Sequence, residues 1–259
     1  MKKIPLITSA IVSLLSTTAS AEEPWTDLGF YLFATGISGD VQLRNVPADV
    51  DASFSDILDN LDSGFMGYIE HRRDKWSFIG ELAYLAVSDE QTSIINPGPG
   101  PGLEINAEVE LSQAIISGYA GYRVLDKDYD ESNLGVDILF GARHTTLDME
   151  FRLAQAIGDF SGSRSADREE DWVDAVIAAR FQSDYNNGWG SMVWLDLGDG
   201  SDSSSYQLMA MASYQSSDNW RFYGGYRFLN LEYETGSGTS TFAVDLDYSG
   251  PMFGASYRL

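Results

Sequence analysis

Polar and apolar residues alternate along most of the chain after residue 21. In 205–216, for example, Tyr206, Leu208 and Tyr214 share one parity, and Gln207 and Ser213 share the other. Alternation over stretches of this length predicts β-strands, because successive side chains of a strand point to opposite faces. About ten such segments recur, at roughly 26–44, 62–73, 75–90, 104–125, 134–153, 170–183, 187–199, 205–216, 219–235 and 240–259.

The connections between these segments differ in length in a regular way. Tight turns at 74–75, 184–187 and 217–219 contrast with long joins at 45–61, 91–103 and 154–169. An even number of strands with short turns at one end and long loops at the other is typical of outer-membrane barrels. We therefore predict an all-β protein, a closed antiparallel transmembrane β-barrel of about ten strands, with eight and twelve as open alternatives.

The two faces of the predicted strands carry different chemistry. In 219–228, Trp220, Phe222 and Tyr226 alternate with Arg221 and Arg227. A barrel in lipid needs its apolar face outside and its ionic groups inside, where opposite charges pair because unpaired buried charge is costly. Parity therefore predicts a charge network in the lumen, made of Glu70, Arg72, Glu81, Arg123, Asp137, Arg143, Asp174, Arg180, Asp196, Arg221, Arg227 and Arg258. We expect the lumen to be narrow or plugged, because a barrel of this size is only slightly wider than side chains can fill.

Toward the long loops the polarity of several strands inverts. On 134–153 the parity that carries Asp137 and Arg143 continues as Leu147 and Met149, while Asp148 falls on the outward parity. We interpret this as a barrel that protrudes beyond the membrane; the competing interpretation is a β-bulge that resets each strand. The inverted positions form a candidate apolar pocket of Leu147, Met149, Phe151, Leu229, Leu231, Phe242, Val244 and Leu246.

The first long loop contains a short helical pattern. Phe54, Ile57, Leu58 and Leu61 recur at helical spacing, with Ser55 as a candidate N-cap. The helix would be either a plug that packs into the apolar upper wall or a lid over a pocket for a hydrophobic ligand. Both hypotheses place Phe54 and Leu58 against the upper interior.

The first residues have the features of an export signal. Lys2 and Lys3 precede an apolar run, 4–15, and a small-x-small site ends at Ala21. We expect a signal peptide over 1–21, cleaved near Ala21, and a barrel domain over 22–259 in the Gram-negative outer membrane. The formal charge of −23 argues against nucleic acid, and the lack of Cys excludes disulfides and thiolate chemistry.

Catalytic and metal-binding patterns are weak. His71 and His144 both fall on the lipid-facing parity, with no nucleophile arranged beside them. Residues 126–137 have the acidic spacing that opens a calcium loop, but Glu131 stands where that loop needs Gly, and we expect a solvated acidic turn. We therefore predict no enzyme activity, no cofactor and no metal site.

The run 54–62, with Phe65-Met66-Gly67, Trp76, Gly224–Arg227 and the segment 250–259, resembles a set of uncharacterised Gram-negative outer-membrane β-barrel proteins. The resemblance implies a barrel domain of the outer membrane protein A or porin-like kind, and it carries over no functional residues. The alternating end, with Phe253, Tyr257 and Leu259, resembles the signal read by the barrel assembly machinery.

The function expected from these features is a structural or surface-interaction role. The alternatives are a binding or transport barrel for a small hydrophobic molecule and, with less support, an outer-membrane lipid hydrolase. The expected partners are outer-membrane lipid, lipopolysaccharide and the assembly machinery, with a small hydrophobic ligand under the first alternative.

Overall fold

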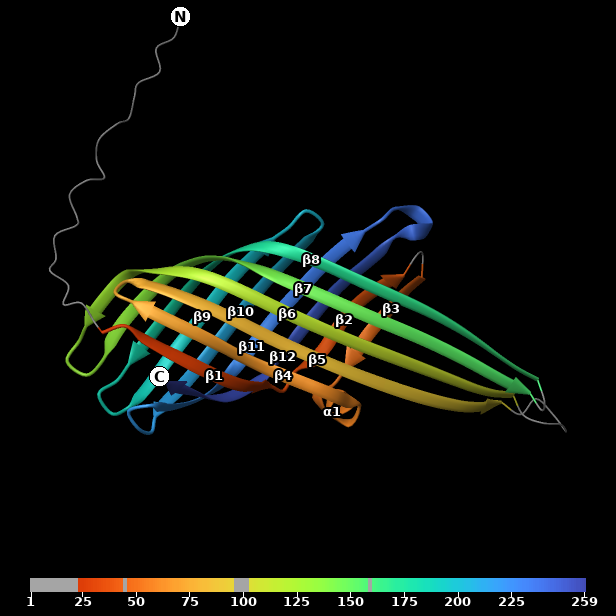
Figure 1. Ribbon diagram of the computed structural model, residues 1–259, viewed down its shortest axis with the longest axis horizontal. Coiled ribbons are helices and arrows are strands. Elements are labelled where there is room, and N and C mark those ends of the chain that lie inside the picture. Colours follow the sequence, from red (N-terminus) through yellow and green to blue (C-terminus); the bar gives the residue numbers. More distant parts are fainter. Residues whose placement is uncertain (1–22, 44–45, 96–102, 158–159) are drawn as a thin grey trace, which may run out of the picture.

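The computed structural model describes residues 23–43, 46–95, 103–157 and 160–259, so the predicted signal peptide lies outside the described residues. Ten of twelve strands close into an antiparallel barrel through the pairing of β1 with β12 (Figure 1). These strands are β1 (Trp25–Phe33), β4 (Leu61–Arg73), β5 (Trp76–Ile95), β6 (Leu103–Asp128), β7 (Asn133–Ile157), β8 (Phe160–Asp184), β9 (Trp189–Asp199), β10 (Ser203–Gln215), β11 (Trp220–Thr235) and β12 (Phe242–Arg258). The predicted barrel class and strand number are confirmed.

The two remaining strands form a hairpin, β2 (Gly36–Leu43) and β3 (Val46–Ala52), beside β12. β2 continues the line of β1, because Phe33 pairs with Met252 and Gly36 with Ser249 in an unchanged register. The predicted strand 26–44 is therefore two strands, β1 and β2, that follow one another along β12 with a short interruption between them. β3 occupies the place beside β2 that β4 would need, and β4 pairs with β1 only at its lower end.

The upper wall consequently has a gap in its hydrogen-bonded ladder. Among the described residues, β3 and β4 share no backbone pairing. The short helix α1 (Phe54–Asp59) connects these two strands at the gap. One further short element, the 3₁₀ turn η1 (Gly238–Ser240), joins β11 to β12.

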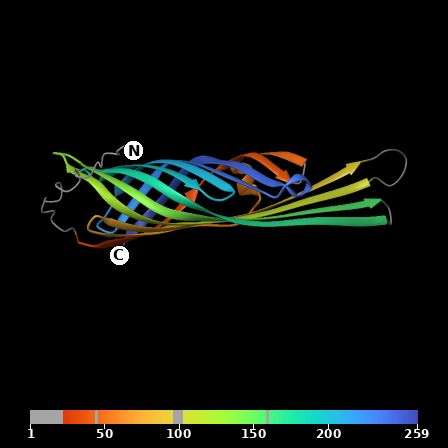
Figure 2. The ribbon, with the colours of Figure 1, turned by 90° about the horizontal axis from the view of Figure 1, so that it is seen from above.

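Four neighbouring strands are much longer than the rest. β5, β6, β7 and β8 span 20, 26, 25 and 25 residues, whereas β9 spans 11. Pairing of β8 with β9 begins only at Ala175. The far ends of the four strands, residues 88–95, 103–110, 150–157 and 160–167, therefore extend beyond the barrel as an open sheet (Figure 2), here called the projecting sheet.

The projecting sheet corrects two predicted loops. Residues 91–103 and 154–169 are predicted to be long joins, but 91–95, 103, 154–157 and 160–169 pair as strands, and the rest of both joins lies outside the described residues. Their Ser, Ala and Gly content carries little alternation, so the sequence pattern fades there. Backbone groups still pair with the neighbouring strands, because each strand offers the next a row of hydrogen-bonding partners.

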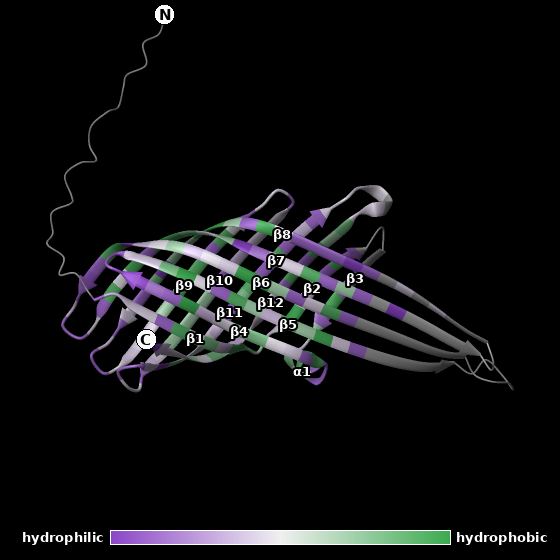
Figure 3. Ribbon diagram, viewed as in Figure 1, coloured by the Kyte–Doolittle hydropathy of each residue, from purple (hydrophilic) through white to green (hydrophobic). Residues whose placement is uncertain are grey.

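The wall between the short turns and α1 has an apolar exterior. Exposed apolar side chains include Phe30, Phe78, Phe140, Ile177 and Leu197, and Figure 3 shows hydrophobic and hydrophilic residues alternating along these strands. Near the short turns, aromatic pairs lie on the outer face: Trp76 with Tyr122, Trp189 with Tyr214, and Trp220 with Tyr257, at ring distances of 5.0, 5.4 and 5.1 Å. Aromatic residues of this kind mark a membrane–water interface.

The inversion of polarity occurs without a change of register. On β7 the lumen face carries Asp137, Arg143, Leu147 and Met149, all buried. β6 pairs with β7 continuously between Gln113–Leu147 and Ser117–Arg143, and its one register shift lies at the lower end, near Arg123. The bulge alternative is therefore wrong for β6 and β7. The β11–β12 ladder also runs without a shift.

Candidate functional site

The lower lumen is occupied by a group of ion pairs centred on Asp137. Arg72 and Arg180 each donate to the Asp137 carboxylate at 2.8 Å, and Arg123 donates to it as well. Arg180 also donates from both terminal nitrogens to Glu70 at 2.8 Å. A buried carboxylate that accepts from three guanidinium groups has its desolvation offset, and this is the condition under which a buried charge is tolerated.

A second group lies farther from the short turns. Arg143 is wholly buried and donates to Asp196 at 2.9 Å and to the Ser205 hydroxyl at 2.8 Å. Ser205 in turn donates to Asp174 at 2.7 Å, so the Ser205 hydroxyl links the Arg143 guanidinium to the Asp174 carboxylate. Sequence reasoning did not single out Ser205, because parity marks a serine as inward without indicating its partner.

The same group continues across the lumen to β1 and β5. Arg227 donates to Glu81 at 2.9 Å and to Gln207 at 2.7 Å, and Gln207 donates to Asp196 at 2.7 Å. Tyr31 donates to Glu81. These bonds join β1, β5, β9, β10 and β11, so the network ties opposite walls of the barrel together.

Two predicted members lie at the short-turn end and are partly exposed. Arg221 donates to Asp184, and Arg258 donates to Asp27, at 2.9 and 2.8 Å. The sequence pattern predicts a turn at Asp184, although the parity of Asp174 and Arg180, continued, places Asp184 inside. All twelve predicted network residues thus lie on the lumen side of the wall.

The upper lumen is filled by apolar side chains. Seven of the eight residues of the candidate apolar pocket belong to one buried cluster, together with Ile37, Ile57, Ile115, Trp172 and Tyr248. The side chain of Phe151 lies outside the described part of the chain. A cavity of about 30 Å³ remains beside Leu229 and Tyr248. The inverted positions therefore pack against one another as a core.

Helix α1 differs from its prediction in two respects. Its N-cap is Ser53, not Ser55, and Ser53 and Asp56 form a capping box. The amide and hydroxyl of Ser53 donate to the Asp56 carboxylate at 2.9 and 2.6 Å, and these bonds hold the pKa of Asp56 below its usual range.

The expectation that Phe54 and Leu58 face the interior is wrong. Ile57 is 7% exposed, whereas Phe54, Leu58 and Leu61 are 43%, 53% and 39% exposed. The hairpin of β2 and β3 brings the helix to the gap in the wall, so only one side of it reaches the core. α1 closes the wall and does not plug the lumen.

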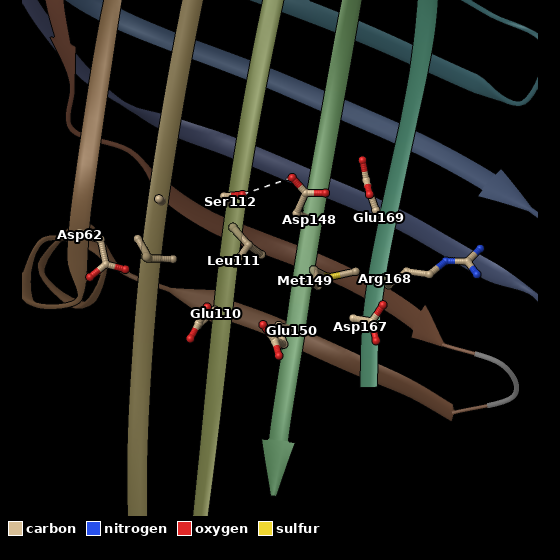
Figure 4. Close-up of a pocket in the computed structure, with 12 residues that line it drawn as sticks. Asp62, Glu110, Leu111, Ser112, Asp148, Met149, Glu150, Asp167, Arg168 and Glu169 are labelled. Carbon is tan, nitrogen blue, oxygen red and sulfur yellow. Dashed lines mark hydrogen bonds between the residues drawn. The ribbon is translucent and has the colours of Figure 1, made fainter. Parts of the chain in front are cut away.

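A hollow of about 270 Å³ lies at the base of the projecting sheet, and Figure 4 shows its side chains on β4 to β8. It is lined by Asp62, Ala86, Val87, Glu110, Leu111, Ser112, Asp148, Met149, Glu150, Asp167, Arg168 and Glu169. Ser112 donates to Asp148 at 3.4 Å, and Arg152 donates to Glu110 at 2.8 Å and to Glu150 at 2.9 Å. Carboxylates predominate in this lining, so the hollow favours cationic groups.

Neither histidine lies in the lumen. His71 contacts Thr26 at 2.9 Å, and His144 contacts Asp171 at 3.2 Å, both on the outer face. The described residues contain no cluster of three or more His, Asp or Glu that could hold a metal ion. The calcium-loop hypothesis is wrong, because Asp137 is buried among arginines.

No helix in the described part of the chain is long and apolar enough to cross a membrane. The apolar exterior, the aromatic pairs near the short turns and the buried ion pairs inside define the class of this protein: it is a transmembrane β-barrel of the outer-membrane type.

Comparisons with known proteins assign no family to this chain. No protein-family model matches the sequence, and no curated protein sequence matches it. Among solved structures, the outer membrane protease OmpT from Escherichia coli aligns with 95% of this chain and 99% of its own, at 11% identity and a TM-score of 0.46. Ail, the attachment invasion locus protein of Yersinia pestis, aligns with 92% of this chain and 100% of its own, at 12% identity and a TM-score of 0.34. The Ralstonia pickettii toluene transporter TbuX covers 92% and 89%, at 12% identity and a TM-score of 0.34. Likeness at these values assigns none of these three roles to the chain.

Proposed function

We propose that this protein is a non-conducting, non-enzymatic outer-membrane barrel that presents the projecting sheet for interaction at the cell surface. The observation that carries the proposal is a contrast in one molecule. The lumen is filled at two levels, by ion pairs below and by an apolar cluster above, while four strands extend well beyond the rest of the wall. The longest strands of the fold therefore extend outside the closed part of the barrel.

The orientation follows from the turns. The start of β1, the C-terminus and the short turns lie at one end of the barrel (Figure 1), and the projecting sheet lies at the other. Short turns of outer-membrane barrels face the periplasm. The projecting sheet then faces the exterior, with the membrane around the apolar wall. Lipid and lipopolysaccharide surround that wall, and the final strand is the segment offered to the assembly machinery.

A closed lumen follows from the energetics of the ion pairs. Separating one partner of a buried pair costs about 3–5 kcal/mol. Asp137, Arg143 and Asp174 are wholly buried and share partners across several strands. Opening a path through them would break several such bonds together, so we expect a non-conducting barrel.

The partner at the surface is expected to be basic. Exposed carboxylates line the hollow at the base of the projecting sheet, and the chain as a whole carries a formal charge of −23. Electrostatic complementarity steers partners of opposite charge and discriminates against those of like charge. A catalytic role has no comparable support, since His144 lies outside the barrel with Asp171 as its bonded partner.

The first test addresses the lumen. The purified barrel is inserted in planar bilayers and, separately, in liposomes supplied with a hydrophobic fluorescent probe. We expect neither ion conductance nor accelerated uptake of the probe. Stepwise conductance would overturn the non-conducting barrel, and probe uptake would favour the transport alternative.

The second test addresses the projecting sheet. Cells display either the full barrel or a variant in which two-residue Asn-Gly turns replace 89–109 and 151–166, where the ladders already pair Ser88 with Glu110 and Glu150 with Asp167. We expect attachment to a surface coated with a basic protein to fall by about tenfold or more. Undiminished attachment by the shortened barrel would overturn the proposal.

A charge-only pair of variants sharpens this test. Asp167→Asn with Glu169→Gln neutralises exposed carboxylates of the hollow, and Asp126→Asn with Asp128→Asn neutralises exposed carboxylates at the opposite end. Only the first pair is expected to weaken attachment. Equal loss in both would show that net charge, not the projecting sheet, governs attachment.

A further inference from the structure

The projecting sheet has an unpaired edge along β8. Residues 160–171 of β8 pair with β7 on one side, and on the other side the ladder to β9 begins only at Ala175. β8 lies at the margin of the projecting sheet (Figure 2), and among the described residues no strand lies beside this stretch on its outer side. A free edge presents a row of backbone N–H and C=O groups that can bind an added strand.

The alternation of the ladder determines which residues of β8 direct their backbone groups to this free edge. Tyr185 donates its N–H to the carbonyl of Trp189 on the β9 side at 2.8 Å. In an antiparallel sheet, the backbone groups of successive residues point to opposite neighbours. β8 has no register shift against β7 or β9. The residues in step with Tyr185, which include Ser165 and Asp167, therefore direct their N–H and C=O groups to the free edge.

Acidic side chains lie at alternate positions along the same edge. Asp167, Glu169 and Asp171 are exposed on the outer face of β8. Across the ladder, Asp167 lies opposite Glu150 and Glu169 lies opposite Asp148, so each pair brings two negative charges together. Like charges directly opposite one another destabilise a sheet, and opposite charges stabilise it. A strand added beside β8 with basic residues at alternate positions would place a positive charge beside each exposed carboxylate.

We propose that the free edge of β8 binds an extended segment of a partner protein as an additional strand, and that this segment carries Lys or Arg at every second position. The inference rests on the proposed function and specifies how the basic partner is held. Strand addition takes its affinity from main-chain hydrogen bonds and its specificity from alternate side chains. A second copy of this chain is a poor occupant, because the outward positions of 163–173 hold three acidic residues and no basic one.

A synthetic peptide in which Lys and Val alternate provides the direct probe. Its binding to the full barrel in detergent is measured by fluorescence anisotropy, beside a peptide of the same composition that has all its Lys residues in one block. Both peptides carry the same charge, so charge attraction alone does not separate them. We expect the alternating peptide to bind more tightly by about tenfold or more, because only its Lys side chains all fall on one face of an extended strand.

Two variants at Ser165 separate strand addition from charge attraction. Ser165→Pro removes an N–H from the free edge and leaves the ladder to β7 and every carboxylate in place. We expect it to weaken binding of the alternating peptide by about tenfold or more. The matched control is Ser165→Thr, which keeps the N–H and should bind as the native chain does. The heat-modifiable shift on gels shows whether both variants fold.

Hydrogen exchange measured by NMR supplies the structural readout. Strand addition should slow exchange of the Asp167 and Glu169 amides, which point to the free edge. Equal binding of the two peptides, equal binding by Ser165→Pro and Ser165→Thr, or unchanged exchange at these amides would each overturn the inference. So would self-association of the barrel that Ser165→Pro abolishes, without peptide binding, because the edge would then be an interface between copies.

The attachment assay distinguishes this inference from the proposed function. Native attachment of Ser165→Pro cells to the basic surface would overturn strand addition and leave the surface role intact. Undiminished attachment by the shortened barrel would overturn the surface role itself, and strand addition with it.

Discussion

The lower and upper halves of this barrel solve the same packing problem with opposite chemistry. Below, apolar side chains such as Phe140 face outward while Asp137 and Arg143 are buried inside. Above, Leu147 and Met149 are buried on the same inner face of β7, and Asp148 is exposed outside. Because β7 and its register are continuous, the lower and upper parts of this strand differ only in what surrounds the wall. A wall in hydrocarbon must hide its charges, and a wall in water must hide its apolar groups.

The largest effect is expected from breaking the lower half. Asp137→Ala leaves three arginines without their common acceptor, and we expect the free energy of unfolding to fall by about 3–5 kcal/mol. Reversible urea unfolding in lipid vesicles, followed by tryptophan fluorescence, measures this change. Asp148→Ala on the same strand removes an exposed carboxylate and should change it by no more than about 0.5 kcal/mol. Equal effects at both positions would contradict the buried network.

A comparable loss is expected in the upper half by a different mechanism. Leu231 is buried in the apolar cluster, and Leu231→Ala should reduce the free energy of unfolding by about 2–5 kcal/mol, because it leaves a cavity among packed side chains. The same urea experiment measures it. Leu58→Ala, on the exposed side of α1, is the control and should have little effect. If Leu58→Ala were the costlier change, the orientation of α1 would be wrong.

A single charge placed at two outward positions of β7 separates the two halves directly. Phe140 is 62% exposed on the apolar wall, so Phe140→Arg should cost about 2–4 kcal/mol in lipid. Asp148→Arg, eight residues farther along the same face, should cost far less, because water surrounds it. Folding yield in vesicles, read from the heat-modifiable shift on gels, ranks the two variants. Equal tolerance would mean that the membrane boundary lies elsewhere.

The smallest effect concerns a row of carboxylates on the upper exterior. Asp40 pairs with Asp245 and Asp49, and the hydrogen bond with Asp49, followed by burial and the two negative charges, raises the pKa of Asp40 above its usual value. A raised pKa means that the folded hairpin favours the protonated form. Its stability is therefore present at low pH and is lost as the pH rises through the pKa of Asp40.

Hydrogen exchange of β2 and β3 tests this dependence. Amide protection is expected to fall as the pH is raised through the titration, after correction for intrinsic exchange. Asp49→Asn should remove most of the dependence, whereas Asp51→Asn, which pairs with Ser38, should leave it. An unchanged profile in Asp49→Asn would contradict the coupling.

Local pattern explains much of what could be predicted. Alternation assigns a face to each residue of a strand, and this was enough to place Arg143, Asp174 and Arg227 on the inner side before any pairing was known. The same rule predicted the inversion at Leu147. The pattern missed the ends of β5 to β8, where Ser and Ala weaken the alternation of polar and apolar residues. It also gave the wrong orientation for Phe54 and Leu58, because the path of the preceding hairpin sets the direction in which α1 faces.

By itself the sequence determined which residues face inward and which outward, because the direction of a side chain is a local property of an extended backbone. Only the tertiary structure decided which inward residues meet. Asp137 gathers arginines from β4, β6 and β8, Met211 lies between Met192 and Met252, and α1 seals the wall because β3 displaced β4. Those contacts depend on the order and stagger of strands far apart in the chain, which closure of the barrel alone sets.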